Sequence, residues 1–199
     1  MDQVKTGVWH WASMHEGIGQ PVHSHYVVTG NEGVVIDPRV PDEGLEWFEE
    51  RTAPTHALLT NRHHYRHAER FRERFGLTVW CNENGMHEFD AGEEVEPFEF
   101  GRQLPGGFTA VEVGVLCDEE TAYHRPESKL VALGDSVISW EGELGFVPDD
   151  YLGEDPDAVK TGLRRSLEGL LDRDFDTLIL AHGEPLVSDA RDRLREFLR

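Results

Sequence analysis

Three segments of the sequence place metal-ligating side chains directly behind an apolar run. They are LLTNRHHYRH (residues 58–67), LVALGDSVI (130–138) and LILAHGEPL (178–186). Strands of a sheet end in loops that can converge on one cleft while the strands hold them rigid. Imidazole and carboxylate groups gathered there are ligands that zinc prefers, and three or four of them bind one ion. The segments therefore predict either a metal site or the remains of one.

Four residues in these segments are the candidate ligands of a single divalent ion, Zn²⁺ in the first instance: His63, His67, Asp135 and His182. His63 and Asp135 are also the candidate catalytic residues, because an ion held there would activate water for hydrolysis. Each has a structural alternative. His63 could cap a turn, His67 falls in a first helical turn where a partly exposed histidine is the default, and Asp135 could cap a helix. A two-metal centre is not expected.

The remaining chemistry-bearing residues have weaker patterns. His64 is expected to point away from its neighbour as a surface or packing residue. His23 and His25 share one face of a predicted strand, a spacing that can bind metal, but strand packing is the favoured interpretation. Neither Cys81 nor Cys117 lies in a nucleophile motif. The sequence also has no GxGxxG, no P-loop and no GxSxG, so nucleotide-phosphate binding and a serine nucleophile are unsupported.

The charge balance is strongly acidic: 39 Asp and Glu residues against 19 Lys and Arg give a formal net charge of −20. Such a chain repels nucleic acid and anionic membranes, so neither is an expected partner. The few lysines and scattered acids are typical of proteins from extreme halophiles, although an ordinary acidic bacterial protein is the alternative. Two cysteines without CxxC spacing and the lack of a signal-peptide pattern predict a cytoplasmic protein. The partner of an active protein would be a small-molecule substrate of unspecified kind; the sequence does not indicate an oligomeric state.

Strand and helix patterns alternate along residues 1–199, which predicts one layered α/β domain with mixed sheets. The predicted strands are residues 7–12, 23–30, 32–38, 55–60, 77–81, 95–100, 108–114, 129–135 and 176–183. The predicted helices are residues 41–51, 67–76, 157–173 and 188–199. Proline and early acids favour a helix start at residue 41, and Gly76 favours a helix stop.

The order of these motifs resembles the metallo-β-lactamase fold superfamily. A strand followed by Thr and a His-rich turn, then a strand with GD, then a strand with HG and Pro are all present, and VVTGNEGVVIDPRV is similar to the family's early hairpin. The resemblance covers the chain from about residue 7 to about residue 198. It implies an αββα four-layer sandwich with two mixed β-sheets, and a site for one or two metal ions that serves hydrolysis.

The His-rich turn departs from the HxHxDH pattern of that family. Without a gap from Thr60, Asn61 stands at the first histidine, His63 matches the second, Tyr65 replaces the aspartate and Arg66 replaces the third histidine. In addition, Val115 stands where a later histidine is expected, while Asp135 and His182 match the last two ligands. A register shifted by one residue would put His64 at the second histidine, Arg66 at the aspartate and His67 at the third histidine, but it needs an insertion and ranks lower.

Two functions remain open from the sequence. One is a metal-dependent hydrolase with a reduced site of at most one ion. The other is a non-catalytic, metal-free relative that keeps the fold as a binding or structural module. Arg66 separates them, because a guanidinium cannot ligate a cation. The favoured expectation is that Arg66, with Arg62, lies against Asp135 and supplies the positive charge that zinc supplies in active relatives.

Overall fold

A computed structural model describes all residues, 1–199, and contains two large mixed sheets and a small hairpin. The first sheet follows chain order, with antiparallel pairing through its first four strands and parallel pairing from the fourth to the seventh. Its strands are β1 (Asp2–Lys5), β2 (Val8–His15), β3 (Gln20–Thr29), β4 (Glu32–Ile36), β5 (Pro54–Leu58), β6 (Thr78–Asn82) and β7 (Val95–Phe98).

The second sheet has the order β15-β14-β11-β10-β9-β8. Only β11 and β14 are parallel; every other neighbouring pair is antiparallel. Its strands are β8 (Gln103–Leu104), β9 (Phe108–Glu112), β10 (Thr121–Arg125), β11 (Leu130–Leu133), β14 (Thr177–Leu180) and β15 (Leu186–Val187). A separate hairpin consists of β12 (Ile138–Trp140) and β13 (Glu143–Gly145).

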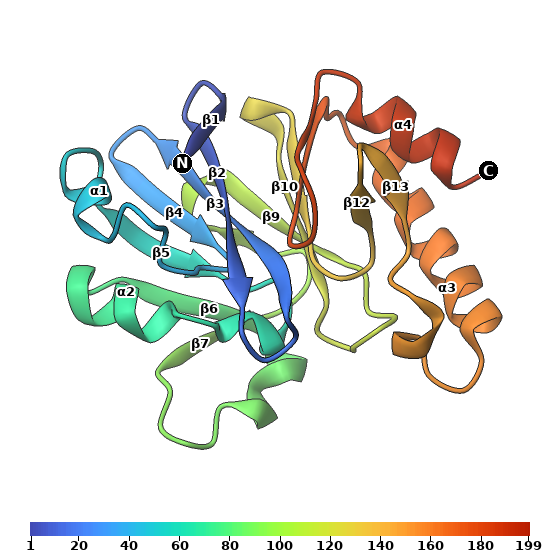
Figure 1. The fold of residues 1–199 in the computed structure, drawn as a ribbon, viewed down its shortest axis with the longest axis horizontal. Coiled ribbons are helices and arrows are strands. Elements are labelled where there is room, and N and C mark those ends of the chain that lie inside the picture. Colours follow the sequence, from blue (N-terminus) through green and yellow to red (C-terminus); the bar gives the residue numbers. More distant parts are fainter.

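Four helices cover the outer faces of the two sheets, α1 and α2 beside the first and α3 and α4 beside the second (Figure 1). Their bounds are α1 (Glu46–Glu49), α2 (Ala68–Phe75), α3 (Pro156–Glu168) and α4 (Ala190–Phe197). Asp155 caps α3 by accepting a hydrogen bond from the backbone N–H of Ala158, and Gly76 ends α2 in a left-handed conformation. The layers are therefore α, β, β and α.

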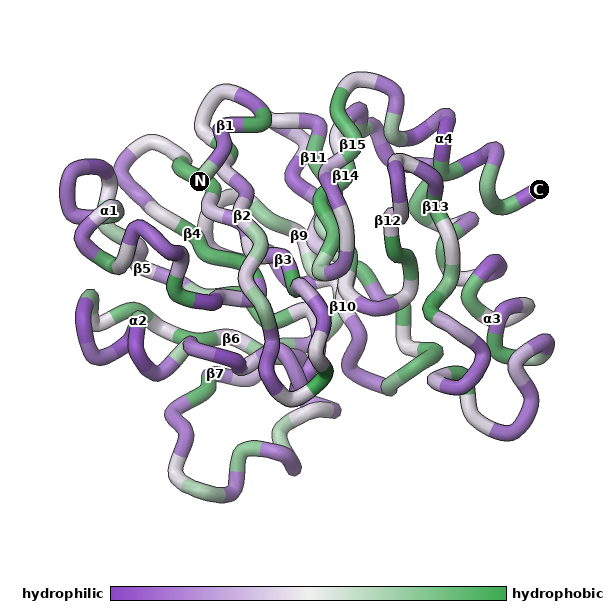
Figure 2. Tube along the Cα trace, in the orientation of Figure 1, coloured by the Kyte–Doolittle hydropathy of each residue, from purple (hydrophilic) through white to green (hydrophobic).

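Three buried clusters correspond to the three interfaces between these layers. The central cluster joins Val34 and Ile36 of β4 to Tyr123 of β10 and Ile179 of β14, so it lies between the sheets. The outer faces form the other two clusters, one with α1 and α2 and one with α3 and α4. Alternation explains the arrangement, since successive side chains of a strand point to opposite faces. Figure 2 shows hydrophobic stretches in these strands and an alternation of hydrophilic and hydrophobic residues along the helices.

The helix predicted at 41–51 is much shorter than expected. Only Glu46–Glu49 is helical, because Gly44 has φ of 80° and the preceding residues form a turn that the proline starts. The other predicted helices and strands are present, with ends that differ by a few residues. No helix is both long enough and apolar enough to span a membrane.

Candidate metal centre

The carboxyl ends of four parallel strands meet at one edge of the sandwich. Asp37 follows β4, the His-rich turn follows β5, Asp135 follows β11 and His182 follows β14. β4 and β5 are parallel neighbours in the first sheet, as β11 and β14 are in the second. Since parallel neighbours end at the same edge, the topology directs polar residues from distant parts of the chain to one place.

Two glycines allow these strand ends to approach one another. A Cβ atom at Gly134 would lie 2.8 Å from Oγ1 of Thr60, so a larger residue would push the ends of β11 and β5 apart. Gly183 has φ of 107°, and a Cβ there would lie 2.0 Å from the carbonyl oxygen of Ser139. Gly134, beside Asp135, is therefore required by its contacts, and Gly183, beside His182, by both its contacts and its dihedral.

His64, Asp135 and His182 form the central group of this edge. One ligand atom from each lies within 4.8 Å of the others. Oδ1 of Asp135 is 3.3 Å from Nε2 of His64 and 3.0 Å from Nε2 of His182. Neither imidazole forms a hydrogen bond of acceptable angle with Oδ1, which is buried without a hydrogen-bond partner. The three ligand atoms are thus close together, with both imidazole nitrogens at ion-pair distance from Oδ1 of Asp135.

A second layer of contacts fixes the His64 ring. Nδ1 of His64 lies 2.8 Å from Oγ1 of Thr60 and 3.0 Å from Oδ2 of Asp37. The Thr60 hydroxyl donates to Oδ2 of Asp37 at 2.7 Å, and the Thr60 backbone N–H donates to Oδ1 at 2.8 Å. This network assigns the Nδ1 proton of His64 to the Thr60–Asp37 side, so the neutral ring presents a free lone pair on Nε2 to Asp135 and His182.

The charges at this edge are unevenly distributed. Burial lowers the pKa of His64, as does Arg66, but Asp135 and Asp37 outweigh both and raise it to about 9. Burial alone would raise the pKa of Asp135, but His64 and His182 hold it well below its usual range. Behind Asp135, burial and the Asp135 charge raise the pKa of Glu120 to about 8. At neutral pH Asp135 therefore carries a charge while Glu120 remains protonated.

The geometry and chemistry of the central group fit one divalent ion. A tetrahedral zinc ion about 2.0–2.2 Å from each ligand separates two ligand atoms by about 3.3 Å, close to both distances from Oδ1 of Asp135. Ligating histidines in metal sites donate their other ring N–H to a carboxylate or similar acceptor, as His64 does toward Thr60 and Asp37. The residues that could hold the ion are His64, Asp135 and His182.

Two predicted ligands lie outside the central group. His63 is exposed, and His64 takes the inward position that the ungapped register gave to His63. The reason is local. Asn61 starts a 3₁₀ turn at Arg62–Tyr65, and the Asn61 side chain accepts a hydrogen bond from the backbone N–H of His63. This turn directs the next residue, His64, inward. His67 precedes α2, where its Nδ1 accepts a hydrogen bond from the backbone N–H of Val40.

The three residues at which the His-rich turn departs from the HxHxDH pattern have other contacts. Asn61 donates from Nδ2 to Oδ2 of Asp135 at 2.9 Å. Tyr65 points to the helix, where its hydroxyl donates to Glu69 at 2.8 Å. Arg66 has φ of 46°, and its Nη1 donates to the carbonyl oxygens of His23 and Asp37 at 2.9 and 3.0 Å.

The expected ion pair between Arg66 and Asp135 is absent, and that prediction is wrong. Arg66 is anchored by backbone carbonyl oxygens. Arg62 pairs with Glu119 and Glu88, not with Asp135. The ring nitrogens nearest to Asp135 are those of His64 and His182. Sequence reasoning also missed Asp37 and Thr60 as the partners of His64, although the hairpin that ends in Asp37 belonged to the family resemblance.

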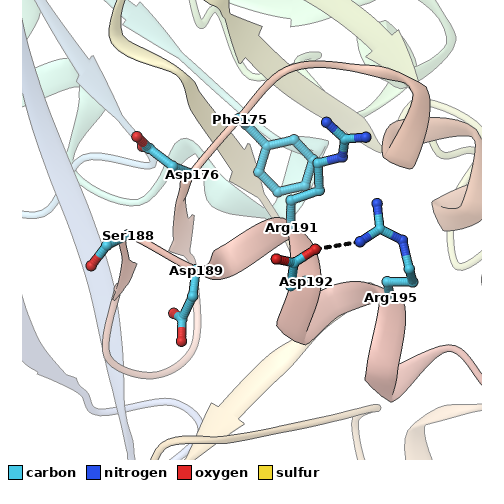
Figure 3. A pocket seen from close by; sticks show the side chains of 7 residues that line it. All are labelled: Phe175, Asp176, Ser188, Asp189, Arg191, Asp192 and Arg195. Atoms are coloured by element: carbon cyan, nitrogen blue, oxygen red, sulfur yellow. Dashed lines mark hydrogen bonds and ion pairs between the residues drawn. The ribbon is translucent and has the colours of Figure 1, made fainter.

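A polar hollow elsewhere on the surface is unrelated to this group. It lies beside the start of β14 and the amino end of α4, whereas His182 follows the end of β14. Figure 3 shows its charged lining, including the ion pair between Asp192 and Arg195.

No protein-family model matches the sequence, and no curated protein matches it. Solved structures match along nearly the whole chain. DIM-1 metallo-β-lactamase has a TM-score of 0.75 at 17% identity, over 98% of this chain and 92% of that chain. A metallo-β-lactamase family protein from Thermus thermophilus has a TM-score of 0.68 at 16% identity, over 98% of this chain and 79% of that chain. The chain has the metallo-β-lactamase fold.

A third match is TTHA1623 in a di-iron-bound form, with a TM-score of 0.70 at 23% identity over 94% of this chain and 99% of that chain. The αββα sandwich with two mixed sheets that the sequence predicted is confirmed by these matches and by the layers described above. At such identities the likeness establishes the metallo-β-lactamase fold alone.

Proposed function

We propose that the protein is a metal-dependent hydrolase with one divalent ion, held by His64, Asp135 and His182. The observation that carries the proposal is the convergence of three ligand atoms from distant parts of the chain, at separations of 3.3 and 3.0 Å from Oδ1 of Asp135. The fold adds support, since similar structures are named metallo-β-lactamases and one is in a di-iron-bound form.

The surrounding residues would prepare the site for such an ion. Asp37 and Thr60 hold the Nδ1 proton of His64 and so keep the Nε2 lone pair directed at the site. Asn61 fixes Asp135 by donating to Oδ2, which leaves Oδ1 as the ligand atom. When bound, a divalent ion supplies Lewis-acid activation of water and of a substrate carbonyl or phosphoryl oxygen.

The solvent side of the group sets the direction from which a substrate arrives. The side chains of Asp135 and His182 are 29% and 24% exposed, whereas His64 is 7% exposed. A small-molecule substrate would therefore approach past Asp135 and His182, while His64 forms the buried wall.

One ion, not two, is the proposal because the position of a second is occupied by other contacts. Oδ2 of Asp135 accepts a hydrogen bond from the Asn61 amide, so this oxygen is already engaged and is not free to bind a second ion. Tyr65 is directed away to Glu69. Arg66 lies close enough to oppose further positive charge, because it already lowers the pKa of His64.

A metal-free module is the second candidate, favoured by one observation. His64 lies between two carboxylates, and its pKa of about 9 makes it a cation at neutral pH when no ion is bound. The charged ring would then bridge Asp37 and Asp135 as a buried ion pair. This reading gives Asp135 and His64 a structural role with no hydrolysis.

Zinc titration of neighbouring histidine variants distinguishes the two candidates. Untagged protein is treated with EDTA, dialysed and titrated with Zn²⁺ by calorimetry, as wild type, His64→Gln and His63→Gln. We expect His64→Gln to weaken zinc binding at this site by more than about 100-fold, beyond the usual loss for an outer partner. His63→Gln is the matched control, since the exposed neighbour should leave the affinity unchanged.

Hydrolysis of a panel of chromogenic esters, phosphodiesters and β-lactams completes the test. Zinc should stimulate the same activity in wild type and His63→Gln but not in His64→Gln. Failure of wild-type protein to bind zinc at this group, or zinc binding that is equal in the two variants, would refute the proposal and leave the metal-free module.

A further inference from the structure

A second histidine cluster lies on one face of the first sheet. His10 of β2 is directly opposite His25 of β3, and His23 precedes His25 by two residues, so all three side chains share that face. All three are buried. The His10 ring stacks on both others, with centroids 4.9 Å from His23 and 5.3 Å from His25.

Glu184 completes this cluster from the solvent side. It follows His182 and Gly183 in the loop after β14, and its side chain is 74% exposed. Its Oε2 lies 3.7 Å from Nδ1 of His10, while Nε2 of His10 lies 2.6 Å from Nδ1 of His23. One ligand atom from each of His10, His23 and Glu184 lies within 4.8 Å of the others.

Metal ions bind the neutral form of imidazole, and burial favours that form in this cluster. Burial, the larger cause, together with the neighbouring His10 lowers the pKa of His23 to about 3, so the ring is neutral at physiological pH. Neutral imidazole has a free lone pair. The contact between His10 and His23 is one N–H···N hydrogen bond, in which one ring nitrogen donates and the other accepts. An ion bound by both rings would displace that proton, and the two nitrogens would move from 2.6 Å to about 3.3 Å apart.

The charges around the cluster come from several elements. Burial lowers the pKa of His10, Glu184 and Asp2 oppose this shift, and the N-terminus adds to it. His182 and Arg66 also lower the pKa of His23. The carboxylates lie on the His10 side, where an ion bound by Glu184 would lie, and the guanidinium lies on the His23 side.

We propose that His10, His23 and Glu184 form a second metal site, separate from the group of His64, Asp135 and His182. Two imidazoles and one carboxylate suit a transition-metal ion such as Zn²⁺, whereas Mg²⁺ and Ca²⁺ prefer oxygen ligands. Glu184 closes the site toward solvent when the ion binds. The site does not depend on the proposed hydrolase, because the two groups share no residue.

Glu184→Gln is the decisive variant, since an exposed side chain can be changed without disturbing the core. The matched control is Glu154→Gln, which alters another exposed glutamate, in the loop before α3. EDTA-treated, untagged wild type and both variants are titrated with Zn²⁺ by calorimetry and with Co²⁺ by visible absorption. The same titrations on His64→Gln identify which equivalent belongs to which site.

We expect the zinc equivalent that survives in His64→Gln to weaken at least about tenfold in Glu184→Gln and to be unchanged in Glu154→Gln. The two proposals can fail separately. If wild type binds no zinc at His64, Asp135 and His182 but binds one ion that Glu184→Gln weakens, the second site is supported and the proposed function fails. The inference is overturned if no zinc binds outside the His64 group. It is also overturned if that zinc binds with equal affinity in Glu184→Gln and Glu154→Gln. The histidines would then be packing residues.

Discussion

Glu120 offers the sharpest test of the electrostatics around the candidate metal centre. It is fully buried, and its Oε1 accepts the backbone N–H of Ser136 at 2.7 Å, while Oε2 has no partner. Burial and the charge of Asp135 raise its pKa from 4.5 to about 8. Glutamine keeps the shape and the Oε1 acceptor but cannot ionise, so Glu120→Gln removes the titration alone.

The direction of the effect follows from proton binding. Between pH 4.5 and about 8 the unfolded chain has lost the Glu120 proton while the native protein retains it, so stability falls as pH rises through this window. Each unit of pKa difference corresponds to about 1.4 kcal/mol. The penalty therefore grows from nearly zero at pH 4 to about 3 kcal/mol at pH 7, and Glu120→Gln should abolish it.

Urea denaturation of wild type and Glu120→Gln from pH 4 to pH 8, with EDTA present, measures this difference. The glutamine amide replaces an unpartnered oxygen and adds a constant offset, so the pH dependence of the difference is the quantity to read. Glu112→Gln, on the exposed face of β9, is the control and should run parallel to wild type. Parallel curves for Glu120→Gln and wild type would mean that Glu120 ionises normally in the folded protein, and the reasoning would be wrong.

Three further outcomes follow from the structure. Asp37→Asn should weaken zinc binding by about 10–100-fold, because it loosens the hold on His64; an unchanged calorimetric affinity would remove Asp37 from the site. Arg66→Met should cost about 3–6 kcal/mol in urea denaturation, because two hydrogen bonds from a charged group are lost, and the cost should be the same in an Asp135→Asn background. A smaller cost in that background would revive the pairing with Asp135. If the net charge of −20 is a halophilic adaptation, the melting temperature should rise from low to molar KCl; a flat or falling series contradicts it.

The fold and two of the three central residues could be predicted from the sequence. Asp135 and His182 each follow a buried apolar strand directly, and the topology of parallel strands then determines the edge at which they lie. Gly134 and Gly183 beside them are part of the same sequence motifs, because each glycine avoids a steric clash at its own strand end. For such residues, sequence position and spatial position are closely linked.

The inward histidine could not be predicted in the same way. His63 and His64 differ by one position, and the choice between them depends on the 3₁₀ turn that Asn61 starts. A turn of this kind has no hydrophobic periodicity that would fix its register. The contacts of Arg66 were equally hidden, because backbone carbonyl oxygens carry no signature in the sequence. The helix predicted at 41–51 was too long, because the proline and the early acids favoured a helix start at residue 41 although Gly44 interrupts the helix there.

A zinc-soaked crystal, measured by anomalous diffraction at the zinc edge, tests the central claim most directly. We predict one ion bound by Nε2 of His64, Nε2 of His182 and Oδ1 of Asp135, with bonds of about 2.0–2.2 Å. The Asn61 amide should remain on Oδ2, with no second ion within about 4 Å of the first. An ion held by His63, a two-ion centre at Asp135, or no anomalous peak among these three residues would contradict the account.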